Sequence, residues 1–141
     1  MANVSKKVFL TTSVFVPFVN RSHQQHNQST AFFRYFAQEN YSLFVNSFTI
    51  SETANQLQKE VSSSISKEFI RIIFNTNIDI IYETESDIKA TVKFYSTYQS
   101  HEINFAQALI ATLADRRNIG QIATLEIYQP LLGQTAFALP F

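Results

Sequence analysis

Short apolar runs alternate with apolar residues at helical spacing in the first third of the chain. Val8-Phe9-Leu10 is an apolar run that stops at three hydroxyl residues, a pattern typical of a buried strand. The polar stretch 20–29 predicts a loop or the frayed start of a helix, because apolar residues return at helical spacing over 31–36. The segment from Tyr41 to Val45 predicts a second strand.

The middle of the chain predicts two helices and a third strand. Thr49 and Glu52 have the spacing of a capping box, in which each side chain satisfies a free N–H group of the first helical turn. An apolar helical stripe follows at residues 50, 54, 57 and 61. Serines interrupt it at 62–64, and the next helix and strand are predicted at 65–73 and 78–82.

The last third predicts two helices and two strands. Thr84 and Asp87 have the spacing of a cap for a helix that carries apolar residues at 88, 92 and 95. Asn104 and Gln107 have the same spacing before a helix whose apolar face runs from 103 to 113. Asn118 is suited to end that helix, as is Gly120 two residues later. Strands are predicted at 122–125 and 135–139.

This order of elements defines the expected fold class. Strands that alternate with helices favour a three-layer α/β/α architecture with a mostly parallel sheet of four to five strands. The chain shows no internal repeat or linker, so residues 1–141 are expected to form one domain. In such sheets, ligands bind beyond the carboxyl ends of the strands.

The amino-acid composition excludes several classes of function. The chain has no cysteine, which excludes disulfides, thiolate metal sites and cysteine nucleophiles. It has only two glycines, too few for a phosphate-binding glycine-rich loop. Acidic and basic residues balance at 11 each, so no overall positive field attracts nucleic acid. No apolar run is long enough to span a bilayer, and the apolar start lacks a cleavage site, so we expect a cytoplasmic protein without a membrane partner.

Polar residues are placed where the predicted strands end. They follow the first, second and fourth strands, or lie in the first turn of the last helix: Thr11, Thr12, Ser13, Ser51, Glu52, Gln107, Thr124 and Glu126. Because the carboxyl ends of parallel strands share one edge of a sheet, we expect these side chains to lie close together.

Four segments that contain these residues resemble, in this order along the chain, the motifs of PIN-domain proteins. The segments are Leu10-Thr11-Thr12-Ser13-Val14-Phe15-Val16, Ser47-Phe48-Thr49-Ile50-Ser51-Glu52-Thr53-Ala54, Asn104-Phe105-Ala106-Gln107-Ala108-Leu109-Ile110-Ala111 and Ile122-Ala123-Thr124-Leu125-Glu126, followed by Leu131-Leu132-Gly133. The resemblance covers nearly the whole chain and is closest to toxin-type endoribonucleases of toxin–antitoxin modules. It implies a PIN-like fold, a homodimer, and RNA or an antitoxin-like protein as partner.

The resemblance also implies a metal site, from which this chain departs. Family members hold Mg²⁺ or Mn²⁺ with four acidic residues, because hard cations prefer oxygen ligands. Here Thr11 and Gln107 stand at two of those positions, and Glu52 and Glu126 stand at the other two. One carboxylate about 4 Å from a divalent ion contributes several kcal/mol before desolvation, so we expect weak metal binding or none. The prediction is a catalytically impaired pseudonuclease that binds RNA or protein. The alternative is an active Mg²⁺- or Mn²⁺-dependent ribonuclease that uses Glu52, Glu126 and a further acid such as Asp87 or Asp115.

Several polar residues also have ordinary structural interpretations. Glu52 has the spacing of a capping residue, and Glu126 is typical of a solvated strand end. His23 and His26 have a spacing that suits a shared metal, but a solvated loop explains them as well. Basic residues at the end of a helix suit its dipole, and isolated acids are expected at the surface; this applies to Arg116, Arg117, Asp87 and Asp115.

Overall fold

A single parallel sheet runs through the middle of the molecule. The structure, a computed structural model, describes residues 6–98, 103–126 and 131–140. Within these ranges the strands are β1 (Lys7–Leu10), β2 (Ser42–Asn46), β3 (Asp79–Ile81), β4 (Gln121–Ala123) and β5 (Thr135–Ala136). They lie in the order β3-β2-β1-β4-β5, and every neighbouring pair is parallel. The predicted parallel sheet is confirmed, with β1 at its centre.

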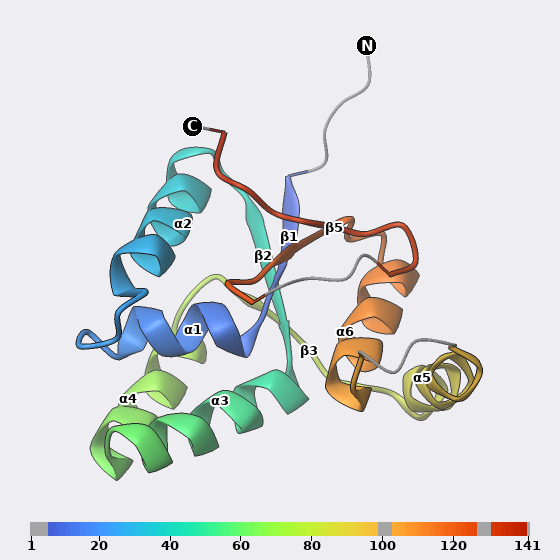
Figure 1. Cartoon of the computed structure of the whole chain (residues 1–141), viewed down its shortest axis with the longest axis horizontal. Coiled ribbons are helices and arrows are strands. Elements are labelled where there is room, and N and C mark those ends of the chain that lie inside the picture. The colour runs from blue at the N-terminus through green and yellow to red at the C-terminus, as the bar shows by residue number, and fades with distance from the viewer. Residues whose placement is uncertain (1–5, 99–102, 127–130, 141) are drawn as a thin grey trace.

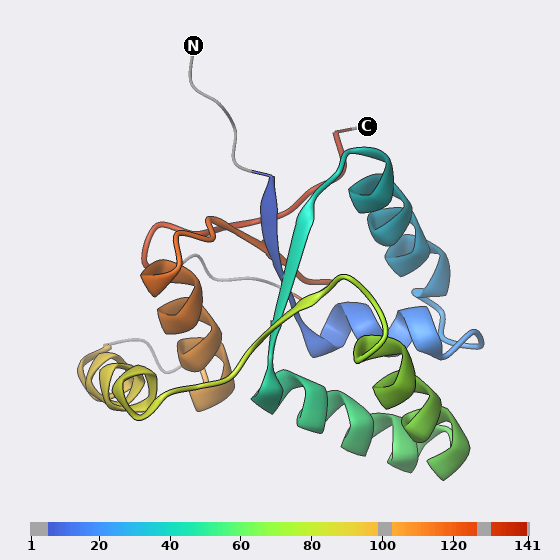
Figure 2. The same ribbon diagram turned by 180° about the vertical axis from the view of Figure 1, so that it is seen from behind.

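Helices cover both faces of this sheet (Figure 1). In the described part of the chain they are α1 (Thr12–Val19), α2 (His26–Gln38), α3 (Ser47–Glu60), α4 (Ser63–Ile73), α5 (Glu85–Thr97) and α6 (Phe105–Arg116). Helices α1 to α4 lie to one side of the strands and α5 and α6 to the other, as Figure 2 shows from behind. The predicted three-layer α/β/α architecture is therefore confirmed.

The alternation of side chains along β1 explains the two layers. Val8 and Leu10 are fully buried against the aromatic core of α1 to α4, whereas Phe9 is buried against α6. Successive residues of a strand point to opposite faces, so a strand covered on both sides is apolar at every position. Phe15 and Phe69 meet edge to face in the larger core, with ring centroids 5.4 Å apart.

Only the start of helix α1 was predicted, because Thr12 and Ser13 suit a strand-to-helix turn with Ser13 as the N-cap. Its sequence is rich in β-branched residues and contains Pro17, which both disfavour a helix. The residues from Val14 to Pro17 are nevertheless all buried, because the helix packs against its neighbours on most sides. Although α1 is strongly apolar, none of the helices in the described ranges combines the length and the apolar character needed to cross a membrane.

The start of α3 also differs from the prediction. The helix begins at Ser47, two residues before the predicted cap, and its N-cap residue is Asn46. The Thr49 hydroxyl donates to the side chain of Asn46 and therefore does not cap the helix. The predicted capping box of Thr49 and Glu52 is wrong, because those residues lie in the first two turns of a helix that has already begun.

The other two predicted caps are confirmed. At α5 the Asp87 N–H donates to the Thr84 hydroxyl (3.1 Å), and the Asp87 carboxylate accepts the Thr84 N–H (2.9 Å). At α6 the same reciprocal bonds join Asn104 and Gln107, each at 2.9 Å. Beyond α6, Asn118 takes the left-handed conformation (φ 58°) that ends a helix.

Candidate functional site

A cavity of about 180 Å³ lies at the carboxyl ends of β1 and β4, between the N-terminal halves of α3 and α6. It is lined by seven of the polar residues that the sequence places at strand and helix ends: Thr11, Thr12, Ser13, Glu52, Gln107, Thr124 and Glu126. The parallel sheet thus brings together residues from the two ends of the chain. Ser51 lies outside this cavity, on the exposed side of α3.

The cavity has an apolar floor and an acidic rim. Ile103, Ile122 and Leu131 contribute buried apolar side chains. Glu52 and Glu126 are both exposed residues on the lining. Among the described residues that line the cavity, none is lysine or arginine. The described lining of the cavity therefore carries about two negative charges and neither lysine nor arginine.

Three hydroxyl groups, Thr11, Ser13 and Thr124, form what we call the hydroxyl cluster. The Thr11 hydroxyl donates to the carbonyl oxygen of Ala123 (2.9 Å) and lies 3.0 Å from the Ser13 hydroxyl. The Ser13 hydroxyl lies 3.0 Å from that of Thr124 and accepts the N–H of Leu125 (3.0 Å). The cluster joins the ends of β1 and β4 through the first turn of α1. The prediction that Ser13 caps α1 is wrong, because Ser13 lies inside that helix and its N-cap residue is Thr11.

Glu52 is oriented by a second pair of hydroxyls. The Thr12 hydroxyl donates to the Glu52 carboxylate (2.8 Å), and the buried Thr53 hydroxyl donates to Thr12 (3.0 Å). This contact replaces the predicted capping role, because the Glu52 side chain points to α1 rather than back along its own helix.

Gln107 lines the cavity but serves its own helix. Its side-chain oxygen accepts the N–H of Asn104 in the capping box described above. Glu126 lies three residues beyond β4, and its N–H donates to the Thr124 hydroxyl (3.1 Å). Its exposed side chain agrees with the solvated strand-end interpretation.

The residues around this cavity do not fit a divalent metal ion. A Mg²⁺ or Mn²⁺ site needs several oxygen ligands with negative charge, held in a fixed geometry. Here the Thr11 proton is bonded to a carbonyl group and the Gln107 oxygen to a backbone N–H, which leaves Glu52 and Glu126 as the charged donors. In the ranges that the structure describes, no group of three or more histidine or acidic residues is placed to hold a metal.

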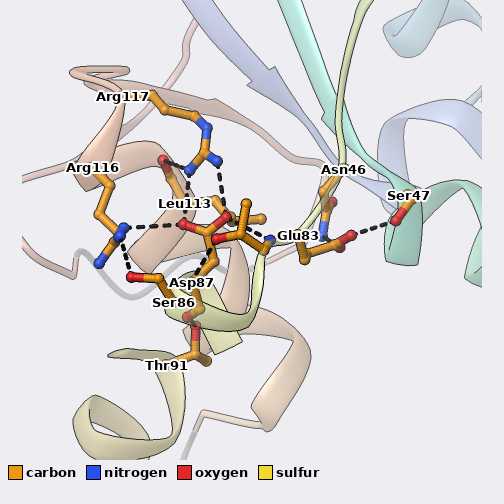
Figure 3. Close-up of polar contacts among 10 residues, drawn as sticks. Asn46, Ser47, Glu83, Ser86, Asp87, Thr91, Leu113, Arg116 and Arg117 are labelled. Atoms are coloured by element: carbon orange, nitrogen blue, oxygen red, sulfur yellow. Dashed lines mark hydrogen bonds and ion pairs between the residues drawn. The ribbon is translucent and has the colours of Figure 1, made fainter. Parts of the chain in front are cut away.

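Glu83 is a polar residue at a strand end that the sequence interpretation missed. Its carboxylate accepts the side-chain N–H of Asn46 (2.9 Å) and the hydroxyl of Ser47, as Figure 3 shows. It also accepts the backbone N–H of Phe48 (3.1 Å). It therefore caps the N-terminus of α3 from the end of β3. The same rule that singled out Thr11 and Glu126, an unusual polar residue just after a strand, would have found it.

Asp87 is not the surface charge that was predicted. Its side chain is 2 % exposed and lies between Arg116 Nε (3.0 Å) and Arg117 Nη2 (2.9 Å), as Figure 3 shows. Hydrogen bonding to Arg117 is the largest cause that lowers the pKa of Asp87 from 3.8 to about 2. Pairing with Asp87 therefore explains the two arginines, in addition to their place at the end of a helix. Asp115 is exposed, as expected. Asp87 thus clamps α5 to α6 and is not part of the cavity lining.

His23 and His26 both make hydrogen bonds to nearby residues. His23 Nδ1 accepts the N–H of Gln25 (3.0 Å) in the loop before α2. His26 is the first residue of α2, and its Nδ1 lies 2.8 Å from the carbonyl oxygen of Pro17. These contacts support a structural interpretation of both side chains.

The fold is similar to that of several solved structures, all of them distant in sequence. No family model and no curated protein matches this sequence. VapC20 from Mycobacterium tuberculosis, a sarcin–ricin loop cleaving toxin, superposes with a TM-score of 0.76 at 14% identity, over 84% of this chain and 89% of that chain. VapBC2 from Rickettsia felis, bound to a DNA fragment from its promoter, gives 0.70 at 15% identity, over 93% and 97%. FitAcB from Neisseria gonorrhoeae gives 0.57 at 17% identity, over 84% and 87%. The chain therefore has a PIN-like fold.

Proposed function

We propose that this chain is a PIN-fold pseudonuclease that acts by binding a protein partner and does not cleave RNA with a divalent metal. The observation that carries the proposal is the state of the two neutral side chains at the replaced acid positions. Thr11 donates its hydroxyl proton to Ala123, and Gln107 caps α6 with its side-chain oxygen. Both side chains belong to the internal bonding of the fold, and only Glu52 and Glu126 remain as charged ligands.

The charge of the cavity favours a protein partner over RNA. Phosphate groups bind where lysine and arginine neutralise them. This cavity offers two carboxylates, and no basic side chain is found among its described lining residues. With neither a tightly held metal nor a basic side chain, an RNA backbone would be repelled. The fold favours an antitoxin-like protein as the partner, since the VapBC2 and FitAcB structures share this fold.

An RNA-cleavage assay with Mg²⁺ and with Mn²⁺ tests the loss of activity. We expect no metal-dependent cleavage by the native chain. The comparison variant is the double substitution Thr11→Asp plus Gln107→Asp, which restores two carboxylates. Strong metal-dependent cleavage by the native chain that is abolished by Glu52→Ala would reject the proposal in favour of an active ribonuclease. A mobility-shift measurement with the same RNA is expected to show no complex, and a stable complex would reject the preference for protein.

Oligomeric state is a separate measurement. We expect a homodimer, which for a 16.2 kDa chain doubles the mass found by light scattering. Co-purification with the product of a neighbouring small gene tests the antitoxin-like partner. A chain that stays monomeric and leaves that product unbound would contradict both expectations.

A further inference from the structure

The hydroxyl cluster has one self-consistent arrangement of protons. Each hydroxyl group donates one proton and accepts at two lone pairs. Thr11 must donate to Ala123, because a carbonyl oxygen only accepts. Ser13 must therefore donate to Thr11, and Thr124 must donate to Ser13. Ser13 also accepts the N–H of Leu125, so its proton and both lone pairs are used.

The Thr12 and Thr53 hydroxyls follow the same logic on the other side of the cavity. Thr53 donates to Thr12, and Thr12 donates to Glu52. Together the two sets of bonds join α1 to the end of β4 and α1 to α3. None of these five hydroxyls has a proton left for a ligand.

We propose that these hydroxyl bonds take the structural place of a divalent ion, so that the cavity keeps its shape without metal. This proposal rests on the proposed function only in assuming that the cavity binds no divalent ion. Carboxylates grouped at the end of a sheet repel one another unless a cation lies between them. The neutral Thr11 removes this requirement, because its hydroxyl bonds directly to the end of β4.

A carboxylate at position 11 would reverse the situation. It has no proton to donate, so it would place a second acceptor near the carbonyl oxygen of Ala123. It would also add a third negative charge to the cavity. The stability of the Thr11→Asp chain is therefore expected to depend on a cation, whereas the stability of the native chain does not.

Thermal unfolding in EDTA and in millimolar Mn²⁺ or Mg²⁺ tests the proposal without any substrate. The native melting temperature is expected to agree within about 1 °C in all three conditions, because an ion that binds only the folded state would raise it. Ser13→Ala is expected to lower it by roughly 5 to 10 °C in every condition, since three partners lose their bond. The matched control is Ser51→Ala, an exposed serine on α3, with an expected change below about 1 °C.

Two substitutions at position 11 complete the test. Thr11→Asp is expected to melt at a lower temperature in EDTA and to recover when Mn²⁺ is added. Thr11→Val, which lacks the hydroxyl but adds no charge, is expected to lose a few degrees with no response to metal, and it serves if Thr11→Asp does not fold.

Three results would overturn the proposal: a native melting temperature that rises with metal, a Ser13→Ala chain as stable as Ser51→Ala, or a Thr11→Val chain that metal stabilises. A stable RNA complex of the native chain in the mobility-shift measurement would instead remove the proposed preference for a protein partner. It would leave these melting results unchanged, so the two failures can be told apart.

Discussion

The cavity and the Asp87 cluster use carboxylates in opposite ways. Asp87 is buried between Arg116 and Arg117, and it also caps α5. Glu52 and Glu126 are exposed at the cavity, where the described lining holds no basic residue. The buried carboxylate is fully paired, and the exposed ones keep most of their hydrogen-bonding capacity for a ligand.

This difference separates residues that hold the fold from residues available for binding. A buried charge that loses its partner destabilises the protein strongly, whereas an exposed charge contributes little. Among the described carboxylates, the one whose pKa is shifted most, Asp87, therefore marks a structural joint between α5 and α6. The cavity is instead recognised by where its residues converge. Substitutions and pH changes at the two sites test this contrast.

Removing the buried carboxylate is expected to have the largest effect. Asp87→Ala leaves two guanidinium groups without their partner and removes half of the α5 capping box. We expect the free energy of unfolding to fall by about 3 to 5 kcal/mol in urea titrations. Asp115→Ala, an exposed acid on α6, is the control and should change it by less than about 0.5 kcal/mol. A loss below about 1 kcal/mol at Asp87 would remove the contrast.

Acid is expected to weaken the same joint reversibly. Because the pKa of Asp87 is lowered from 3.8 to about 2 in the folded chain, its ionised form stabilises the fold. That contribution is complete above about pH 4 and disappears as the pH falls towards 2, with a size of about 2 kcal/mol. Urea unfolding of the native chain and of Asp87→Asn between pH 7 and pH 2.5 measures it. Parallel curves for the two chains would contradict this assignment.

Gln107 is expected to give an intermediate effect. Gln107→Ala removes one bond of the α6 capping box and should cost about 1 kcal/mol of stability. Gln56→Ala removes an amide that also lines the cavity and donates to exposed Glu60, and it should be near neutral. Equal effects of the two substitutions would mean that Gln107 acts through the cavity and not through the cap.

Glu52 and Glu126 are expected to contribute least to stability. Glu52→Gln and Glu126→Gln each remove an exposed negative charge that has no basic neighbour in the described lining. The free energy of unfolding should change by less than about 0.5 kcal/mol in either case. Partner affinity, measured by calorimetry, should fall while stability does not. A clear loss of stability would show that these residues, like Asp87, stabilise the fold.

Much of the fold is contained in the local pattern of the sequence. Continuous apolar runs such as Val8-Phe9-Leu10 predict strands buried on both faces, and the caps at Thr84 and Asn104 mark the starts of two helices. Helix α1 escapes this reasoning, because its residues resemble a strand and only the surrounding core makes them helical. The start of α3 escapes it for the same reason: its cap comes from Glu83, 36 residues from Ser47.

The sequence predicts where the candidate site lies but not the hydrogen bonds that its residues make. The rule for parallel sheets brings Thr11, Gln107 and Glu126 to one cavity. It does not reveal that Thr12 orients Glu52, nor that Asp87 is buried between two arginines. Such contacts join residues 30 or 40 positions apart, so they depend on how the helices pack.

The central position of β1 has a consequence for synthesis. Ser13 and Thr124 lie 111 residues apart, so at 5 to 20 residues per second the ribosome needs about 5 to 20 seconds to deliver the second after the first. During that interval β1, β2 and β3 can assemble with α1 to α4. The edge of the apolar strand β1 that later pairs with β4 is still without its neighbour. An open apolar edge is a point where unwanted strands pair. Arrival of β4 therefore both completes the cavity and ends the period in which the nascent chain is most exposed to aggregation.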